Sequence, residues 1–245
     1  MNTAPIDAQA GHAAAVADAK RLMRLARVGA LATLDPDTGA PLTTLVGVAS
    51  DFDGAPLFLL STLARHTRHV ARDPRVSLLL SGAPARGDPL NHPRVTLSGA
   101  IEKTAEPSAR ARYLVRNPKA KLYAGFADFA FFRLAIDRVH FNGGFGRADA
   151  LTPVDLLASR DAQIEIARLE PDILGEINAR GATFAARLAG HKASARKVWR
   201  AIGLDPDGLD LASGAHAARL AFPRQARDAA SWRALFAEAS GGAIP

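Results

Sequence analysis

Three strand-length segments lie close together near the N-terminus, and the links between them are too short to contain a helix. The segments are 28–34 (VGALATL), 41–49 (PLTTLVGVA) and 56–60 (PLFLL). The links DPDTGA and SDFDGA carry the aspartate, proline and glycine of tight turns. Strands joined in this way pair antiparallel, because a parallel crossover needs a dozen residues or more. The first part of the chain is therefore predicted to form an antiparallel β-structure.

The same pattern continues to about residue 150. Further strands are predicted at 76–81 and 94–104 and within the aromatic segment 122–148, whereas 13–27 and 106–117 have the apolar spacing of amphipathic helices. Helices do not alternate regularly with the strands, as they would in a doubly wound sheet. The pattern therefore favours an antiparallel barrel with few helices.

The composition changes near residue 155. Segment 161–189 is predicted to be mostly helical, with an interruption at Gly175 or Gly181 and with Pro171 in a first helical turn. The sequence thus predicts two domains, residues 1–155 and residues 156–245.

The remainder of the second domain mixes strands and a helix. Three short strands are predicted from RKVWRAIGL, LDLAS and ARLAF, and the segment 226–240 is predicted to close the chain as a helix. The predicted fold class is mainly β, a split β-barrel followed by a small C-terminal α+β domain.

Composition excludes several classes of protein. The chain has no cysteine, which rules out disulfides, thiolate catalysis and cysteine-ligated metals. No stretch approaches the roughly 20 apolar residues of a membrane span. The N-terminus also lacks the basic and apolar regions of a secretion signal. We therefore expect a cytoplasmic protein with no membrane partner.

The charge balance is basic. Lysine and arginine outnumber aspartate and glutamate by 31 to 24, and most of the excess precedes residue 150. Because there is no lysine-rich tail, recognition-helix signature or zinc-finger spacing, we expect no nucleic-acid partner. The excess indicates either a compositional bias towards arginine or a preference for small anionic ligands.

The link between the third and fourth predicted strands is rich in side chains that bind anions. Its segment ARHTRHVAR is predicted to form a short helix that ends at Asp73-Pro74, because the residue before proline disfavours helical geometry. The start of a helix offers unpaired N–H groups to a phosphate or carboxylate, and Arg65 adds a planar fork. Alternatively, the arginines form a solvated helix face, and Ser61 or Thr62 merely caps the helix.

The run PLFLLSTLARHTRHVARDPRVSLLL resembles the strand–helix–strand unit of the pyridoxamine 5′-phosphate oxidase-like FMN-binding split barrels. In that family an arginine–lysine pair at the start of the helix grips the FMN phosphate, and the resemblance puts Arg65 and His66 on this pair. LARHT, FADFAFFRLAIDRVHFNGGFGRA and residues 160–245 are similar to the haem-utilisation (HugZ-type) branch. The resemblance extends from Arg21 over nearly the whole chain.

The resemblance implies FMN as the cofactor and a homodimer with the flavin at the subunit interface. Thr43 and Thr44 match a phosphate-contacting strand position, and Arg94 lies where the oxidase has a glutamine near the flavin. The complete set of implied FMN-binding residues is Thr43, Thr44, Ser61, Thr62, Arg65, His66, Thr67 and Arg94. No catalytic side chain is predicted, because a flavin itself performs the redox step.

The implied function is that of a flavin-dependent oxidoreductase with a small-molecule substrate, acting in haem utilisation. The alternative is a non-catalytic flavin or haem carrier. A pyridoxamine phosphate oxidase is disfavoured, because the chain ends in FAEASGGAIP where that enzyme has an Arg-Leu-x-Pro motif.

Haem is the second ligand implied, either as a substrate or as a bound group. The haem branch carries Asn-x-x-His where this chain has Asn178-Ala179-Arg180-Gly181, which leaves His191 and His216 as candidates to ligate the iron. His66 and His69 share a predicted helix face, but no third ligand stands near them in the sequence, so no protein-bound metal site is predicted.

Overall fold

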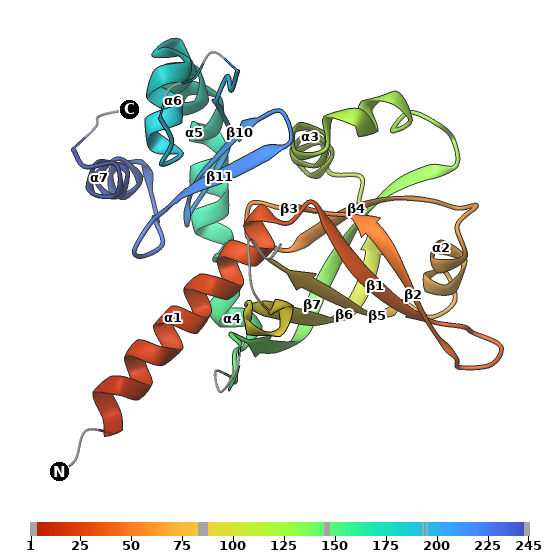
Figure 1. Ribbon diagram of the computed structural model, residues 1–245. Coiled ribbons are helices and arrows are strands. Elements are labelled where there is room, and N and C mark those ends of the chain that lie inside the picture. Colours follow the sequence, from red (N-terminus) through yellow and green to blue (C-terminus); the bar gives the residue numbers. More distant parts are fainter. Residues whose placement is uncertain (1–3, 83–87, 145–147, 193, 195, 243–245) are drawn as a thin grey trace. The chain divides into compact units, whose positions relative to one another are not determined.

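The computed structural model describes residues 4–82, 88–144, 148–192, 194 and 196–242 (Figure 1). Contacts within the chain divide it into two compact units, Met1–Leu157 and Ala158–Pro245.

The first unit is built on one antiparallel sheet with the strand order β2-β1-β5-β6-β7-β4-β3, and a short β8 pairs with β7. The sheet curls so that β2 and β4, which are not paired, approach each other. The predicted antiparallel split barrel is confirmed. The strands are β1 (Val28–Leu34), β2 (Pro41–Gly47), β3 (Ala49–Ser50), β4 (Pro56–Ser61), β5 (Arg75–Ser81), β6 (Arg94–Lys103), β7 (Phe129–Asn142) and β8 (Ala148–Asp149).

The helices of the first unit close the barrel or cover its outside. They are α1 (Ala4–Leu25), α2 (Arg65–Val70), α3 (Pro107–Arg116) and α4 (Pro153–Leu156), with two 3-10 turns at Pro89–Asn91 and Pro118–Leu122. Helix α1 buries Ala15, Ala19 and Met23 in the same core as the strands, whereas α2 lies at one end of the barrel beside β1 and β2 (Figure 1).

Alternation along the strands separates an inner from an outer face. In β5 the residues Val76, Leu78 and Leu80 are buried in the barrel, and Leu79 between them is partly exposed. Strand β4 is buried on both faces, because Leu57 and Leu59 pack against α3. The outer face of the sheet is therefore covered at β4, and the same cover does not extend to β5.

One glycine is required by the geometry of the sheet. The register between β6 and β7 shifts at Ser98–Gly99, and a Cβ atom on Gly99 would overlap the carbonyl oxygen of Ala135. The two backbones approach so closely at this bulge that only glycine fits there.

The second unit combines helices with a three-stranded antiparallel sheet in the order β11-β10-β9. Its elements are α5 (Arg160–Ala179), α6 (Gly181–Leu188), β9 (Arg200–Asp205), β10 (Gly208–Ser213), β11 (His216–Ala221) and α7 (Ala229–Ala239). Trp199, Trp232 and Phe236 lie in its core. The predicted α+β character is confirmed.

Two details of the helical prediction have different outcomes. The predicted break is at Gly181, whose φ of 85° is favourable for glycine, while Gly175 lies inside α5. The placement of Pro171 in a first turn is wrong, since it lies within α5. Ile166, Ile173 and Ile177 bury one face of that helix, which offsets the roughly 3 kcal/mol cost of an interior proline.

In the part of the chain that the structure describes, no helix combines the length and the apolar character that crossing a membrane requires.

Candidate functional site

Helix α2 follows β4 directly and carries most of the predicted binding residues. It spans Arg65–Val70 and ends before Asp73-Pro74, as predicted. Its N-cap residue is Ala64, and no described side chain caps it. Ser61 instead accepts a hydrogen bond from the backbone N–H of Leu63 at 3.1 Å, so its local role is to shape the turn before the helix.

One side of α2 is attached to the hairpin of β1 and β2 through two histidines. Thr44 Oγ1 and His66 Nδ1 are joined by a hydrogen bond of 3.0 Å, and Thr33 Oγ1 and His69 Nδ1 by one of 3.1 Å. His69 Nε2 also lies 3.6 Å from Asp35 Oδ2. Burial lowers the pKa of His66, and the charge of His69 lowers it further, which favours a neutral imidazole. The i,i+3 spacing of the two histidines thus serves packing against the hairpin.

Another side of α2 faces the mouth of the barrel. Thr67 is only 4% exposed, and its Oγ1 is buried without a hydrogen-bond partner among the described residues. Together with Thr62 it lines a cavity between α2 and the strands β6 and β7. The adjacent residues His66 and Thr67 therefore face different parts of the molecule, the β1–β2 hairpin and the cavity, because successive helical residues point about 100° apart.

The remaining residues of the predicted set near α2 have distinct environments. Arg65 is exposed. Ser61 donates its hydroxyl proton to Asp128 Oδ2 at 2.6 Å. Thr43 is exposed on the outer face of β2, whereas Thr44 shares the inner face with buried Val46. A phosphate fits the exposed guanidinium of Arg65 and the free nitrogen of His66, but it does not fit Ser61, whose proton already serves a carboxylate.

Arg94 lies far from α2 within one chain. It begins β6, pairs with Ser81 and Asn142, and donates a hydrogen bond to the carbonyl oxygen of Leu90 at 3.0 Å. The cavity beside α2 contacts the other end of β6, at Lys103. Nine residues of a strand separate the two positions, about 30 Å. The structure therefore brings Thr44 and His66 together, and Thr62 and Thr67 together, but does not bring Arg94 to either pair.

The outer face of the sheet holds a group of residues that sequence reasoning missed. Directly paired residues across β2, β1, β5, β6 and β7 form one row, which consists of Leu45, Ala30, Leu79, Thr96 and His140. Leu45 is 75% exposed, Leu79 is 39% exposed, and His140 is exposed as well. Alternation along each strand indicates that these residues face outward, but only the register aligns them.

The next row of the same face is small and polar. It consists of Thr43, Ala32, Ser77, Ser98 and Arg138, which are again paired across the five strands. Ser98 donates a hydrogen bond to Ser77 at 3.3 Å, and Arg138 is exposed. We call the two rows together the outer-face surface.

The candidate iron ligands of the second unit are both exposed, and the asparagine before them is structural. His191 stacks on Trp199 with ring centroids 4.8 Å apart, and His216 begins β11. The Asn178 side chain donates to the carbonyl oxygen of Ala201 at 3.0 Å and accepts from its N–H at 2.9 Å. Asn178 therefore joins α5 to β9 through the backbone.

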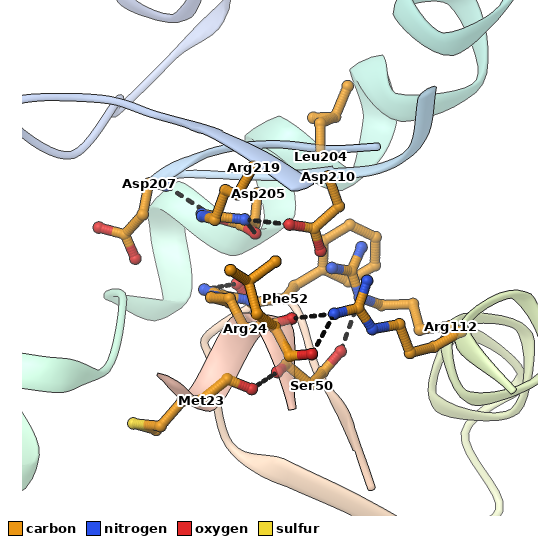
Figure 2. Close-up of polar contacts among 12 residues, drawn as sticks. Met23, Arg24, Ser50, Phe52, Arg112, Leu204, Asp205, Asp207, Asp210 and Arg219 are labelled. Carbon is orange, nitrogen blue, oxygen red and sulfur yellow. Dashed lines mark hydrogen bonds and ion pairs between the residues drawn. The ribbon is translucent and has the colours of Figure 1, made fainter. Parts of the chain in front are cut away.

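Buried charges in the second unit form an ion-pair network. Arg219 donates to Asp205 at 2.7 and 2.9 Å and to Asp210 at 2.7 Å, and all three side chains are largely buried (Figure 2). Burial by itself lowers the pKa of Arg219, but the charges of the two aspartates outweigh it and raise that pKa. A permanently charged guanidinium between two carboxylates joins β11 to β9 and β10 and provides no group that can transfer a proton at neutral pH.

No cluster of three or more histidine or acidic side chains that could hold a metal ion occurs among the described residues.

The fold and the strand register define an antiparallel split barrel whose outer face is only partly covered. A family model described as the CREG β-barrel matches residues 10–157. The chain belongs to this family, and the predicted split-barrel resemblance is confirmed.

Solved structures similar to the whole chain support this assignment. A protein of unknown function from Agrobacterium tumefaciens is 34% identical, with a TM-score of 0.79, and the match covers 93% of this chain and 95% of that one. A haem-binding protein from Mycobacterium smegmatis is 27% identical, with a TM-score of 0.55, over 93% of this chain and 96% of that one.

A curated relative is similar to part of the chain. The non-canonical haem oxygenase HOZ, a chloroplastic protein of Arabidopsis thaliana, is 33% identical over 113 residues, which are 45% of this chain and 34% of that protein. The chain thus matches about a third of the length of this relative.

Proposed function

We propose that this protein binds haem on the outer-face surface of its split barrel and acts in haem utilisation. The similarity along nearly the whole chain to a haem-binding protein supports haem as the ligand. The partial similarity to a haem oxygenase supports a role in haem utilisation. The observation that carries the proposal is the outer-face surface, where exposed His140 and Arg138 share a face with exposed Leu79 two strands away.

The chemistry of this surface matches the parts of haem. The apolar ring system would lie over Thr96 and extend to Leu79 on the next strand, because ligation by His140 keeps the iron close to β7. His140 and Arg138 lie two residues apart on β7, with the imidazole available to the iron and the guanidinium available to a propionate. Bound haem would supply the oxygen chemistry, and the chain would hold it and limit its access to water.

A titration with haem tests this proposal. The purified protein should give a saturable Soret band typical of histidine ligation, and His140→Ala should abolish that spectrum. His191→Ala and His216→Ala serve as matched controls, because each removes one exposed imidazole from the second unit. A histidine-ligated spectrum that survives in His140→Ala and disappears in either control would refute the outer-face site.

Turnover separates an enzyme from a carrier. Given a reductant and oxygen, an oxygenase should consume the Soret band and release iron. A carrier should keep the haem intact under the same conditions. The second outcome would support the non-catalytic alternative.

The exposed leucines also support a homodimer with the ligand between the subunits. Leu79 lies in the middle strand of the outer-face surface, where an apolar side chain is better placed against a partner than in water. A second copy of the same surface would cover both leucines and the bound group.

FMN binding, with flavin-dependent oxidoreduction, is a second candidate that a separate observation favours. Arg65 is exposed at the start of α2, and a hydrogen bond between Thr44 Oγ1 and His66 Nδ1 orients the imidazole ring. When the Thr44 hydroxyl donates, Nε2 carries the ring proton and can donate in turn. These groups suit a phosphate, whereas the Thr43 hydroxyl lies on the opposite face of β2. The bound flavin would supply the redox step.

A comparison of two flavins tests the phosphate assignment. Arg65→Ala should weaken FMN binding by roughly 10- to 100-fold, the equivalent of one charge-assisted hydrogen bond, and should leave riboflavin binding unchanged. Arg72→Ala, in an exposed arginine just beyond the same helix, is the control. Equal losses for both flavins would refute the assignment. In the wild-type protein, reduction of bound FMN by NADH or NADPH would identify a flavin-dependent oxidoreductase.

A further inference from the structure

A cavity at the mouth of the barrel is separate from the outer-face surface and from the Arg65–His66 pair. Its volume is about 220 Å³. It is lined by Thr62, Thr67, Arg68, Val70, Ala71, Ile101, Lys103 and Phe132. Thr62 and Thr67, which were predicted to bind FMN, are among these lining residues.

The spacing of the lining residues explains how the cavity forms. Thr67, Val70 and Ala71 are three and four residues apart and share one side of α2. Ile101 and Lys103 are two residues apart on the inner face of β6, and Lys103 pairs with Phe132 of β7. The helix therefore forms one wall and the strand ends form the other.

One residue that lines the cavity has an unsatisfied hydroxyl. Thr67 Oγ1 is buried and has no hydrogen-bond partner among the described residues, although the Thr67 side chain lines a partly apolar space. Leaving such a group unpaired costs about 1–3 kcal/mol. A rotation about χ1 that turns this hydroxyl into the cavity would let a polar atom of a ligand offset that cost.

Two cations lie at the opening of the cavity. Arg68 and Lys103 both line it and are exposed. In the described part of the chain, neither is within 4 Å of a carboxylate. Because Val70, Ile101 and Phe132 supply an apolar interior, the site combines a positive entrance with an apolar body.

The size of the cavity restricts the ligand. It is larger than the roughly 150 Å³ apolar cavity that takes up benzene, and smaller than the roughly 300–1,000 Å³ of pockets for drug-sized molecules. A flavin or a tetrapyrrole is therefore too large for it.

We propose that the barrel-mouth cavity binds a small monocarboxylate with a compact apolar body, such as an aromatic acid. The carboxylate accepts hydrogen bonds from Thr67 Oγ1 and from the cations Arg68 and Lys103, and the ring contacts Val70, Ile101 and Phe132. Binding of this kind needs no flavin or haem, so its test is independent of the proposed function.

Fluorine NMR with 4-fluorobenzoate as the probe tests the site in the full-length protein. We expect saturable binding with a dissociation constant below about 1 mM, and binding at least tenfold weaker for neutral 4-fluorobenzamide. Lys103→Met and Arg68→Gln should each weaken 4-fluorobenzoate binding roughly tenfold.

Thr67→Val separates binding from folding. The substitution preserves the shape of the side chain and removes the unpaired hydroxyl, so we expect weaker binding, by about fivefold, with no fall in the melting temperature. Arg72→Gln is the matched control, since it removes a nearby exposed charge that does not line the cavity.

Three results would overturn the proposal. The first is no saturation by 4-fluorobenzoate up to about 10 mM, which would mean that the cavity holds only water. The second is equal binding of the acid and the amide. The third is a loss in Arg72→Gln as large as that in Lys103→Met, which would indicate general charge attraction without a defined site.

Discussion

Leu78 and Leu79 are adjacent in β5 and have opposite surroundings. Leu78 is 0% exposed and packs inside the barrel, and Leu79 is 39% exposed on the outer-face surface. The two side chains are chemically identical, so the difference comes only from the face of the strand that each occupies.

The comparison extends to the whole sheet. The inner face has a continuous apolar core, whereas the outer face is covered only in part. At β4 and the start of β7, Leu57, Leu59 and Phe131 pack against Tyr113 of α3. At β1, β5 and β6 the outer residues are small or polar, apart from Val28, Leu34 and Leu79. Residues on the inner face stabilise the barrel, and those on the uncovered part form the surface for which we propose ligand binding.

The largest expected effect is on the inner face. Leu78→Ala should lower the free energy of unfolding by about 2–5 kcal/mol, because it leaves a cavity in a closely packed core. Leu79→Ala should change it by no more than about 0.5 kcal/mol. Urea denaturation followed by far-UV circular dichroism measures both. Tryptophan fluorescence is the control for global disruption, since Trp199 and Trp232 both belong to the second unit. Equal losses for the two leucines would remove the distinction between the faces.

The next largest loss of stability is expected at the ion pairs of Arg133, on the covered part of the outer face. Arg133 on β7 forms ion pairs with Asp51 at 3.0 Å and with Asp53, whose side chain is 6% exposed. Arg133→Met leaves the buried carboxylate of Asp53 without its main partner, which costs several kcal/mol at a fully buried site. Because Arg133 is about one third exposed, we expect a loss of about 1–3 kcal/mol in the same urea experiment. Arg72→Met, in an exposed pair with Asp37, should be close to neutral.

A substitution on the uncovered part of the outer face should affect dimer assembly and leave folding unchanged. If two outer-face surfaces pair, Leu79→Arg should raise the dimer dissociation constant at least tenfold, because it places a charge in an apolar contact. Analytical ultracentrifugation measures this change. Leu122→Arg, at another exposed leucine outside the sheet, is the control. A wild-type protein that is monomeric at all concentrations would contradict the proposed homodimer.

Local patterns in the sequence predicted most of the fold. The segments 28–34 and 94–104 predicted β1 and β6 to within a residue, because strand alternation and turn residues are local signals. Pro171 was misplaced because tertiary packing of α5 outweighs the local cost of proline.

The site was predicted less completely, for a physical reason. Thr44 and His66 of the implied set are hydrogen-bonded, whereas Arg94 lies at the other end of a ten-residue strand, and its place beside a flavin between two subunits stays a prediction. His140 and Leu79 lie in the same row of the outer face only because of the register of three strands, β5, β6 and β7. Register depends on contacts between distant segments, and a single sequence does not encode it in any local pattern.

The smallest expected effect is the acid dependence of the Arg133 contact. Burial alone would raise the pKa of Asp53, but the hydrogen bond and charge of Arg133 outweigh it and hold that pKa below its usual value of 3.8. The folded protein therefore binds this proton less readily than the unfolded chain. The stability that Asp53 contributes is present above about pH 4 and is lost as the pH falls through the lowered folded pKa. In Arg133→Met the Ala55 N–H and the charge of Arg24 still favour the Asp53 carboxylate, but its main partner is gone and its burial remains, so protonation should relieve the variant. Urea midpoints measured from pH 6 down to about pH 2.5 should converge for the wild type and Arg133→Met. A constant gap over that range would show that Arg133 stabilises the outer face through packing of its methylene groups.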